Sequence, residues 1–155
     1  MADGNKFLKI KDGVVKGCDK SATEIAIPEG VTEIGVGAFQ RCLSLAGITI
    51  PNSVTEIGYL AFHECESLAD ITIPNGVTEI GDYAFLGCLS LADITISDSV
   101  TKIGSAAFAG CQSLADIRFG GTESQWKAVE KGEDWNSGVP SSMVRCTDGE
   151  TQQTR

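Results

Sequence analysis

The chain has 155 residues, 42% of them hydrophobic, and its 21 acidic against 12 basic side chains give a formal net charge of -9. No apolar run approaches the roughly 18 residues that a membrane-spanning helix needs, and a negative field of this size repels phosphate groups. We therefore expect neither nucleic acid nor membrane insertion. The opening residues lack the apolar segment of a secretion signal, so we expect any such signal to have been removed or never to have existed.

The segment "FLKIKDGVVKGC", residues 7–18, predicts a β-hairpin at the start of the chain. Asp12-Gly13 is the expected turn, because this dipeptide between two apolar runs is typical of tight hairpins. Cys18 lies nine residues before Ile27, whereas the equivalent spacing further along the chain is eight, so this unit is out of register with the later ones. We therefore predict that residues 1–26 form an N-terminal cap.

Residues 27–120 repeat with a period of 23. The markers of the period are Cys42, Cys65, Cys88 and Cys111, together with Phe39, Phe62, Phe85 and Phe108. A fixed period in this range is typical of a solenoid, in which each unit buries its apolar face against its neighbours. We therefore predict about five coils of 23 residues, mainly β with short helical turns, in which parallel strands stack on one another.

One coil can be followed from Leu68 to Cys88. Apolar and polar residues alternate up to Ile73, which is typical of a strand with one buried face, and Pro74 then begins a turn. A second short extended piece and a helical turn complete the coil. The inward positions predicted for this coil are Leu68, Ile71, Ile73, Val77, Ile80, Ala84, Phe85 and Cys88.

The C-terminal residues predict a different kind of unit. Thr122 and Gln125 have the spacing of a capping box, so we expect a helix over residues 123–131 that Gly132 ends. Trp126, Val129 and Trp135 would close the last coil. A strand is expected over residues 143–146, so residues 121–146 are assigned to a C-terminal cap and residues 147–155 to a disordered tail.

The four periodic cysteines are predicted to be reduced and buried. Equivalent residues of stacked parallel strands lie roughly 4.8 Å apart, whereas a disulfide needs Cβ atoms about 3.5 to 4.5 Å apart. A line of equally spaced sulfurs does not converge on one point, as the four ligands of zinc must. We therefore interpret these cysteines as small apolar core residues and predict no metal and no cofactor.

The unit "AFxxCxSLxxIxIPxxVTEIG" resembles the BspA-like class of leucine-rich repeats, which occurs in surface proteins of bacteria and of some mucosal protists. The resemblance covers nearly the whole chain, and "GTESQWKAVEKGEDWNSGVP" also looks like the C-terminal cap of that class. In one repeat the matching residues are Ala61, Phe62, Cys65, Leu68, Ile71, Ile73, Pro74, Val77, Ile80 and Gly81. The resemblance implies a leucine-rich-repeat-like solenoid that acts in adhesion or recognition at a cell surface, and it supplies no catalytic residues.

The sequence contains no recognisable set of catalytic residues. His63 is the only histidine, and no nucleophile is placed beside it. No glycine-rich loop has phosphate-binding spacing. We therefore predict that the protein is not an enzyme.

Outward strand positions are expected to form columns. Asp70, Asp93 and Asp116 make one column, and Glu33, Glu56, Glu79 and Lys102 make another. Both are most simply solvated faces, since repulsion between neighbouring carboxylates in water is only about 1 kcal/mol. For the aspartate column, a partner-binding face and a calcium site are the alternatives.

The repeats differ from one another mainly at exposed loop positions, where neutral drift and recognition are both possible causes. Among the differing pairs, Val36-Gly37 corresponds to Tyr59-Leu60. The residues able to form a binding patch on adjacent coils are predicted to be Tyr59, Leu60, His63, Tyr83 and Leu86.

The sequence is compatible with two functions from different classes. The first is an adhesion module of a secreted or surface-displayed bacterial protein, with a host extracellular-matrix or cell-surface protein as partner. The second is a structural spacer that holds another domain away from the cell and has no ligand of its own.

Overall fold

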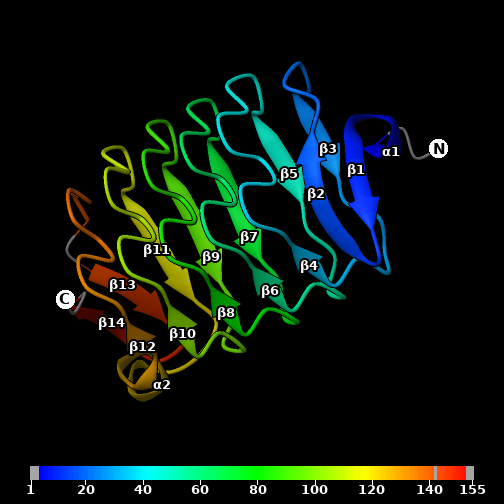
Figure 1. Cartoon of the computed structure of the whole chain (residues 1–155). Helices are drawn as coiled ribbons and strands as arrows, with labels where there is room; N and C mark the ends of the chain where they lie inside the picture. Colours follow the sequence, from blue (N-terminus) through cyan, green and yellow to red (C-terminus); the bar gives the residue numbers. More distant parts are fainter. Residues whose placement is uncertain (1–3, 142, 153–155) are drawn as a thin grey trace.

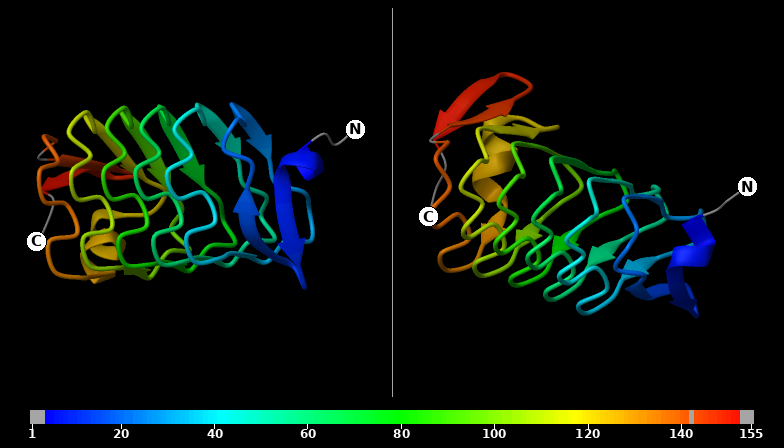
Figure 2. Two further views of the ribbon diagram at one scale, coloured as in Figure 1. Left: turned by 45° about the horizontal axis from the view of Figure 1, so that its top comes forward. Right: turned by 90° about the horizontal axis from the view of Figure 1, so that it is seen from above.

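The computed structural model describes residues 4–141 and 143–152, which form a solenoid of stacked coils (Figure 1). The coils succeed one another along a single axis, with α1 and β1 at one end and α2, β13 and β14 at the other (Figure 2). Neither helix in the described part of the chain, α1 (Gly4–Phe7) or α2 (Glu123–Ala128), is long and apolar enough to cross a membrane. The predicted solenoid is confirmed.

Each repeat contributes one short strand to one side of the solenoid and one longer strand to another side. The short-strand sheet has seven strands in the order β1 (Leu8–Lys11), β2 (Val14–Cys18), β4 (Glu33–Ile34), β6 (Glu56–Ile57), β8 (Glu79–Ile80), β10 (Lys102–Ile103) and β12 (Glu130–Lys131). The long-strand side has β3 (Glu24–Ala26) beside β5 (Gly47–Thr49), then β7 (Asp70–Ile73), β9 (Asp93–Ile96), β11 (Asp116–Phe119), β13 (Met143–Cys146) and β14 (Gly149–Gln152). A run of turns forms the third side.

Equivalent residues of successive coils pair in register. In the parallel strands β7 and β9, for example, Asp70 pairs with Asp93 and Ile73 with Ile96. The strand alternates as the sequence predicts, since Ile71 and Ile73 are buried while Asp70 and Thr72 are exposed. All eight positions predicted to face inward in this coil are buried.

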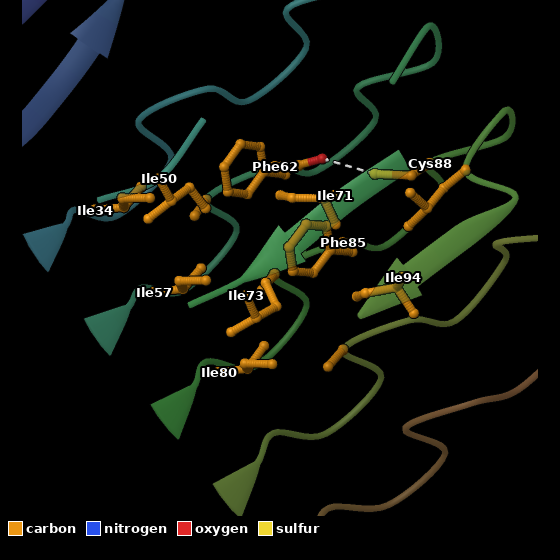
Figure 3. Packing of buried hydrophobic residues seen from close by; sticks show 14 of the residues in the cluster. Ile34, Ile50, Ile57, Phe62, Ile71, Ile73, Ile80, Phe85, Cys88 and Ile94 are labelled. Atoms are coloured by element: carbon orange, nitrogen blue, oxygen red, sulfur yellow. Dashed lines mark hydrogen bonds between the residues drawn. The ribbon is translucent and has the colours of Figure 1, made fainter. Parts of the chain in front are cut away.

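A column of phenylalanine rings runs through the core. Phe39 and Phe62, and likewise Phe62 and Phe85, have ring centroids 5.0 Å apart and almost parallel planes, and Phe108 continues the column at 5.1 Å. Figure 3 shows Phe62 and Phe85 surrounded by isoleucines of both strand sets. Parallel offset rings are a favourable aromatic geometry, and their spacing is close to the roughly 4.8 Å between strands.

The periodic cysteines form a second buried column, as predicted. Three of them donate an Sγ hydrogen bond to a phenylalanine carbonyl of the preceding coil: Cys65 to Phe39 at 3.0 Å, Cys88 to Phe62 at 3.1 Å, and Cys111 to Phe85 at 3.1 Å. The bond of Cys88 is drawn in Figure 3. These thiols therefore act as polar side chains as well as apolar ones, because each adds a second hydrogen bond to a buried carbonyl oxygen that already accepts from a backbone amide.

Glycine comes after each of several short strands because adjacent coils approach closely there. A Cβ atom added at Gly58 would lie 2.9 Å from the carbonyl oxygen of Ile34, and one at Gly81 would lie 2.8 Å from the carbonyl carbon of Gly58. Both distances are too short for any side chain, so the glycine of "VTEIG" is a requirement of stacking.

The N-terminal hairpin forms as predicted, with β1 antiparallel to β2. The stacked ladder, however, begins inside the segment that was assigned to the cap. Strand β2 already pairs parallel with β4, and β3 pairs parallel with β5. The residue shift before Ile27 therefore does not stop residues 14–26 from joining the solenoid.

The predicted helix of the C-terminal cap is shorter than expected. The capping box of Thr122 and Gln125 is present, but α2 ends at Ala128, and residues 130–131 form β12 beside β10. The amide of Glu130 donates to the carbonyl of Thr101 at 2.9 Å. The prediction of helix to residue 131 was wrong, because the edge of the last coil provides parallel strand partners.

The prediction of a disordered tail was wrong for its first part. Strand β14 pairs antiparallel with β13 across the turn at residues 147–148, and Thr151 is buried. Residues 153–155 lie outside the described part of the chain. A polar sequence can form an edge strand where one neighbouring strand supplies the hydrogen bonds, so polarity alone was a poor guide here.

We expect the cysteine column to resist thiol reagents. Burial raises the pKa of Cys65 to about 12, so its thiolate is scarce at neutral pH as well as inaccessible. A hydrogen bond with Cys18 lowers the pKa of Cys42 to about 7, so this thiol is protected by its burial alone. Maleimide titration of the native protein should modify at most the partly buried Cys18 and Cys146, and all six thiols should react after unfolding. Modification of more than two thiols in the native state would contradict this assignment.

The C-terminal cap is expected to carry much of the stability. Trp126 packs against Phe119 with centroids 5.2 Å apart, and Trp135 packs against Phe108 at 6.3 Å. Trp126→Ala should destabilise the protein by about 3–5 kcal/mol in chemical denaturation, and a chain ending at Gly120 should aggregate because its last coil is uncovered. A truncated chain that stays monomeric with an unchanged melting temperature would show that this unit is not a cap.

Candidate binding surfaces

Two exposed tyrosines meet where the short-strand sheet gives way to the turn side. Tyr59 comes shortly after β6 and Tyr83 shortly after β8, and their rings form an edge-to-face pair with centroids 5.8 Å apart. Their exposed fractions are 47% and 37%. The structure therefore brings together two of the residues predicted to form a binding patch, although they occupy different positions within the repeat.

The backbone at this place is strained. Leu60 has φ 59° and Tyr83 has φ 58°, in the left-handed region, and the equivalent residue of the preceding coil is Gly37 with φ 62°. Left-handed backbone costs roughly 1–2 kcal/mol for a residue with a side chain and almost nothing for glycine. Stacking imposes the same turn on every coil, since the amide of Leu60 donates to Asp82 and that of Tyr83 to Ser105.

Val36 is a residue that the predicted patch omitted. It is 69% exposed and occupies the repeat position of Tyr59 on the preceding coil. The amide of the next residue, Gly37, donates to the carbonyl of Tyr59 at 2.9 Å, so the two positions adjoin. The comparison of repeats contained this signal, because the Val36-Gly37 pair is one of those that differ. We call Val36, Tyr59, Leu60 and Tyr83 the aromatic edge.

His63 and Leu86 lie further along the turn side. His63 accepts at Nδ1 a hydrogen bond from Nε2 of Gln40, 3.0 Å away, and its side chain is only 20% exposed. Glu64 pairs with Arg41 and lies 3.8 Å from Nε2 of His63. Backbone turns connect both residues to the aromatic edge, since the amide of His63 donates to the carbonyl of Leu60 and that of Leu86 to the carbonyl of Tyr83, each at 3.2 Å.

A row of carboxylates borders the aromatic edge. Glu33, Glu56 and Glu79 pair in register across β4, β6 and β8, and the row continues through Lys102 and Glu130. Burial, and then the charges of Glu33 and Glu79, raise the pKa of Glu56 above its ordinary value of 4.5. This row was interpreted from the sequence as a solvated face alone.

The carboxylate row and the aromatic edge share one hollow of about 220 Å³. Its side chains are those of Glu56, Tyr59, Glu79, Asp82 and Lys102, and its floor is the backbone of Ile80 and of the glycines at the ends of the short strands. One aromatic ring therefore stands beside three carboxylates and one ammonium group.

The aspartate column lies on the long-strand side. A hollow of about 280 Å³ there is lined by Asp70, Ile71, Thr72, Asp93, Thr95 and Arg118, and it shares no residue with the hollow beside Tyr59. The three carboxylates are not equivalent. Asp116 accepts from Arg118 at 2.8 Å and lies 3.5 Å from Nε of Arg145, whereas Asp70 and Asp93 are exposed and form no ion pair among the described residues.

Metal binding has no geometric support in the described residues. No group of three or more histidine, cysteine, aspartate or glutamate side chains there is placed to hold an ion. Stacking keeps the equivalent carboxylates in a line along the solenoid, and a line of ligands does not surround a cation.

Comparison with known proteins gives a family for this architecture. The model of the BspA type leucine rich repeat region matches residues 8–128 in six copies. A comparison with curated proteins finds no match.

Several solved structures are similar to the chain. A leucine rich cell surface protein from Faecalibacterium prausnitzii is 32% identical with a TM-score of 0.66 over 76% of this chain and 38% of that one. The T. pallidum leucine rich repeat protein is 25% identical with a TM-score of 0.59 over 83% and 80%. The pneumococcal vaccine antigen PcpA, 22% identical with a TM-score of 0.68 over 82% and 31%, shows the same fold. The chain thus spans about two fifths of the F. prausnitzii protein.

The carboxylate row predicts a pH-dependent stability. Because the folded state raises the pKa of Glu56, ionising this group costs more in the folded than in the unfolded protein. The contribution of Glu56 to stability should therefore fall as the pH rises from about 4.5 through the raised value. Glu56→Gln should have a higher melting temperature than the parent at pH 7 and the same one well below pH 4.5; an equal difference at both pH values would contradict the electrostatic cause.

Proposed function

The chain belongs to the BspA-type leucine-rich repeat family, and from this premise we propose that it is a non-enzymatic module that binds a protein partner at a bacterial cell surface through the aromatic edge. The similarity to a cell surface protein of F. prausnitzii supports surface display. An extracellular-matrix or host cell-surface protein is the partner class that such a location favours.

Exposure of the tyrosine pair is the observation that carries this proposal. The described chain has six exposed large hydrophobic residues, and three of them, Val36, Tyr59 and Tyr83, belong to the aromatic edge. Tyrosine is enriched among the few residues that dominate binding energy, because it buries a large rigid surface and keeps a polar group. Clustered exposed apolar groups are typical of interaction sites, whereas single ones are ordinary.

The left-handed backbone of the aromatic edge is a property of the stacked turns. Glycine at positions 60 and 83 would adopt the left-handed turn at little cost, as Gly37 does in the preceding coil. Ala106 has the same conformation at the same repeat position, with φ 53°, and lies outside the aromatic edge. The strain therefore comes from stacking, and the support for recognition is the kind of side chain at positions 59, 60 and 83.

The other residues of the predicted patch receive secondary roles. His63 and Leu86 border the contact area on the turn side. Asp70 and Asp93 would raise the rate of encounter with a basic partner, and their effect should decrease with added salt. Asp116 contributes less to this field, because two arginines already neutralise it.

A spacer without a ligand is the second candidate. Its support is the regularity of the scaffold, in which the phenylalanine column continues unbroken from Phe39 to Phe108. A rod of this kind could separate other domains. It gives no reason, however, for two exposed tyrosines in contact with each other.

The test is a binding assay against fibronectin, fibrinogen and epithelial cells. The informative variant is Tyr59→Ala/Tyr83→Gly, since glycine at position 83 removes the side chain and relieves the backbone together. We expect this variant to fold at least as stably as Tyr59→Ala alone and to lose roughly 30-fold or more in affinity for the target, as truncation of an interface anchor does.

Leu43→Ala/Leu89→Ala is the matched control, because these leucines are 44% and 38% exposed and lie outside the aromatic edge. It should bind like the parent. Binding that survives loss of both tyrosines but decreases in Asp70→Asn/Asp93→Asn would move the site to the long-strand side. A parent chain that binds none of the targets would favour the spacer.

A further inference from the structure

The hollow beside Tyr59 carries an excess of negative charge. Three carboxylates, of Glu56, Glu79 and Asp82, line it together with one cation, Lys102, which leaves a formal charge of -2. Glu33 adds a further carboxylate in register beside Glu56. Asp82 is held in place, because its Oδ1 accepts a hydrogen bond from the amide of Ser105 at 2.8 Å.

Lys102 relieves this charge only in part. It pairs in register with Glu79 on one side and with Glu130 on the other, so it has two carboxylate neighbours of its own. Glu56 has carboxylates on both sides instead, Glu33 and Glu79, and their repulsion contributes to its raised pKa. A cation supplied from outside would therefore be stabilised most strongly beside Glu56.

The residues that line the hollow suit a planar cation such as a guanidinium group. The ring of Tyr59 stands at the hollow, and aromatic rings attract guanidinium groups that lie within about 6 Å of the centroid. The floor at Gly58 and Gly81 cannot acquire side chains, because a Cβ atom there would collide with the preceding coil. The backbone floor is thus kept open by the stacking itself.

A bare metal ion is a poorer occupant than a guanidinium group. The described residues include no group of three or more ligands that could surround an ion. Carboxylates spaced along stacked strands, roughly 4.8 Å apart, can instead each accept one N–H of a planar group that has five donors. Arginine also stacks on aromatic faces, which the strongly hydrated ammonium of lysine does less well.

We propose that the hollow lined by Glu56, Tyr59 and Glu79 receives an arginine side chain of the protein partner. This inference rests on the proposed function and specifies the chemistry of its ligand. The apolar groups of Val36 and Tyr83, on the neighbouring coils, then contact apolar residues that flank this arginine. The partner segment is accordingly basic and hydrophobic, which complements the net charge of -9.

The experiment measures fluorescence anisotropy of labelled peptides that carry one arginine between leucines. In the matched peptides, citrulline, which has nearly the same shape without the charge, or lysine replaces the arginine. We expect the arginine peptide to bind about tenfold or more tightly than the citrulline peptide at low salt, with the lysine peptide between them and the difference decreasing as salt is added.

The protein variant is Glu56→Gln/Glu79→Gln, which should fold well because it removes mutual repulsion. It should bind the arginine and citrulline peptides equally. Asp70→Asn/Asp93→Asn removes the same charge from the other hollow and should retain the preference for arginine. Lys102→Ala should strengthen binding of the arginine peptide.

Equal binding of the arginine and citrulline peptides by the parent chain, or no binding of the arginine peptide, would overturn the inference. The proposed function would still stand if the tyrosine variant lost binding to a protein target while Glu56→Gln/Glu79→Gln retained it. Loss of arginine preference in the Asp70→Asn/Asp93→Asn variant instead would place the arginine on the long-strand side.

Discussion

Stacking of equivalent residues from one coil to the next is the constraint on which the rest of the structure depends. The phenylalanine rings repeat at about 5 Å, close to the distance between parallel strands, so the aromatic column and the backbone ladders fit one another without distortion. A coil with one residue more or fewer would displace its phenylalanine from this column. The constancy of the 23-residue period follows from that requirement, as do the glycines that allow the coils to approach and the thiols that bond to carbonyls of the preceding coil.

The same constraint determines what the surface can do. In-register pairing turns any residue that recurs in the repeat into a column, so charges that are 23 residues apart become neighbours. The pKa of Glu56 is raised first by burial and then by the charges of Glu33 and Glu79, which stacking places on either side of it. Function in such a scaffold is concentrated where the repeats differ. The aromatic edge is one of the places where the repeats differ, and its position beside a row of carboxylates interrupted by Lys102 is the basis of the proposed preference for a basic partner.

The first and last coils are covered by different structures. An antiparallel hairpin, β1 and β2, covers the first coil, whereas two tryptophans and the short helix α2 cover the last one. Lys131 links the end of α2 to β12, because its ammonium donates to the carbonyls of Trp126 and Val129 and lies 4.4 Å above the Trp126 ring. Both units supply partners for exposed strand edges as well as apolar cover.

The sequence by itself determined the period, the solenoid, the inward set of each coil, the N-terminal hairpin and the capping box at Thr122, because each of these is written in local spacing and periodicity. Tertiary structure alone decided which surface residues meet. It placed the ring of Tyr59 against that of Tyr83, buried much of His63 beside Gln40, and paired Asp116 with two arginines. It also ended α2 at Ala128 and placed residues 149–152 of the polar tail in a strand. These outcomes depend on the geometry of turns and on edge hydrogen bonds between segments distant in the chain. Periodicity shows which residues occupy equivalent positions, but it does not show which partner each side chain finds across a coil boundary.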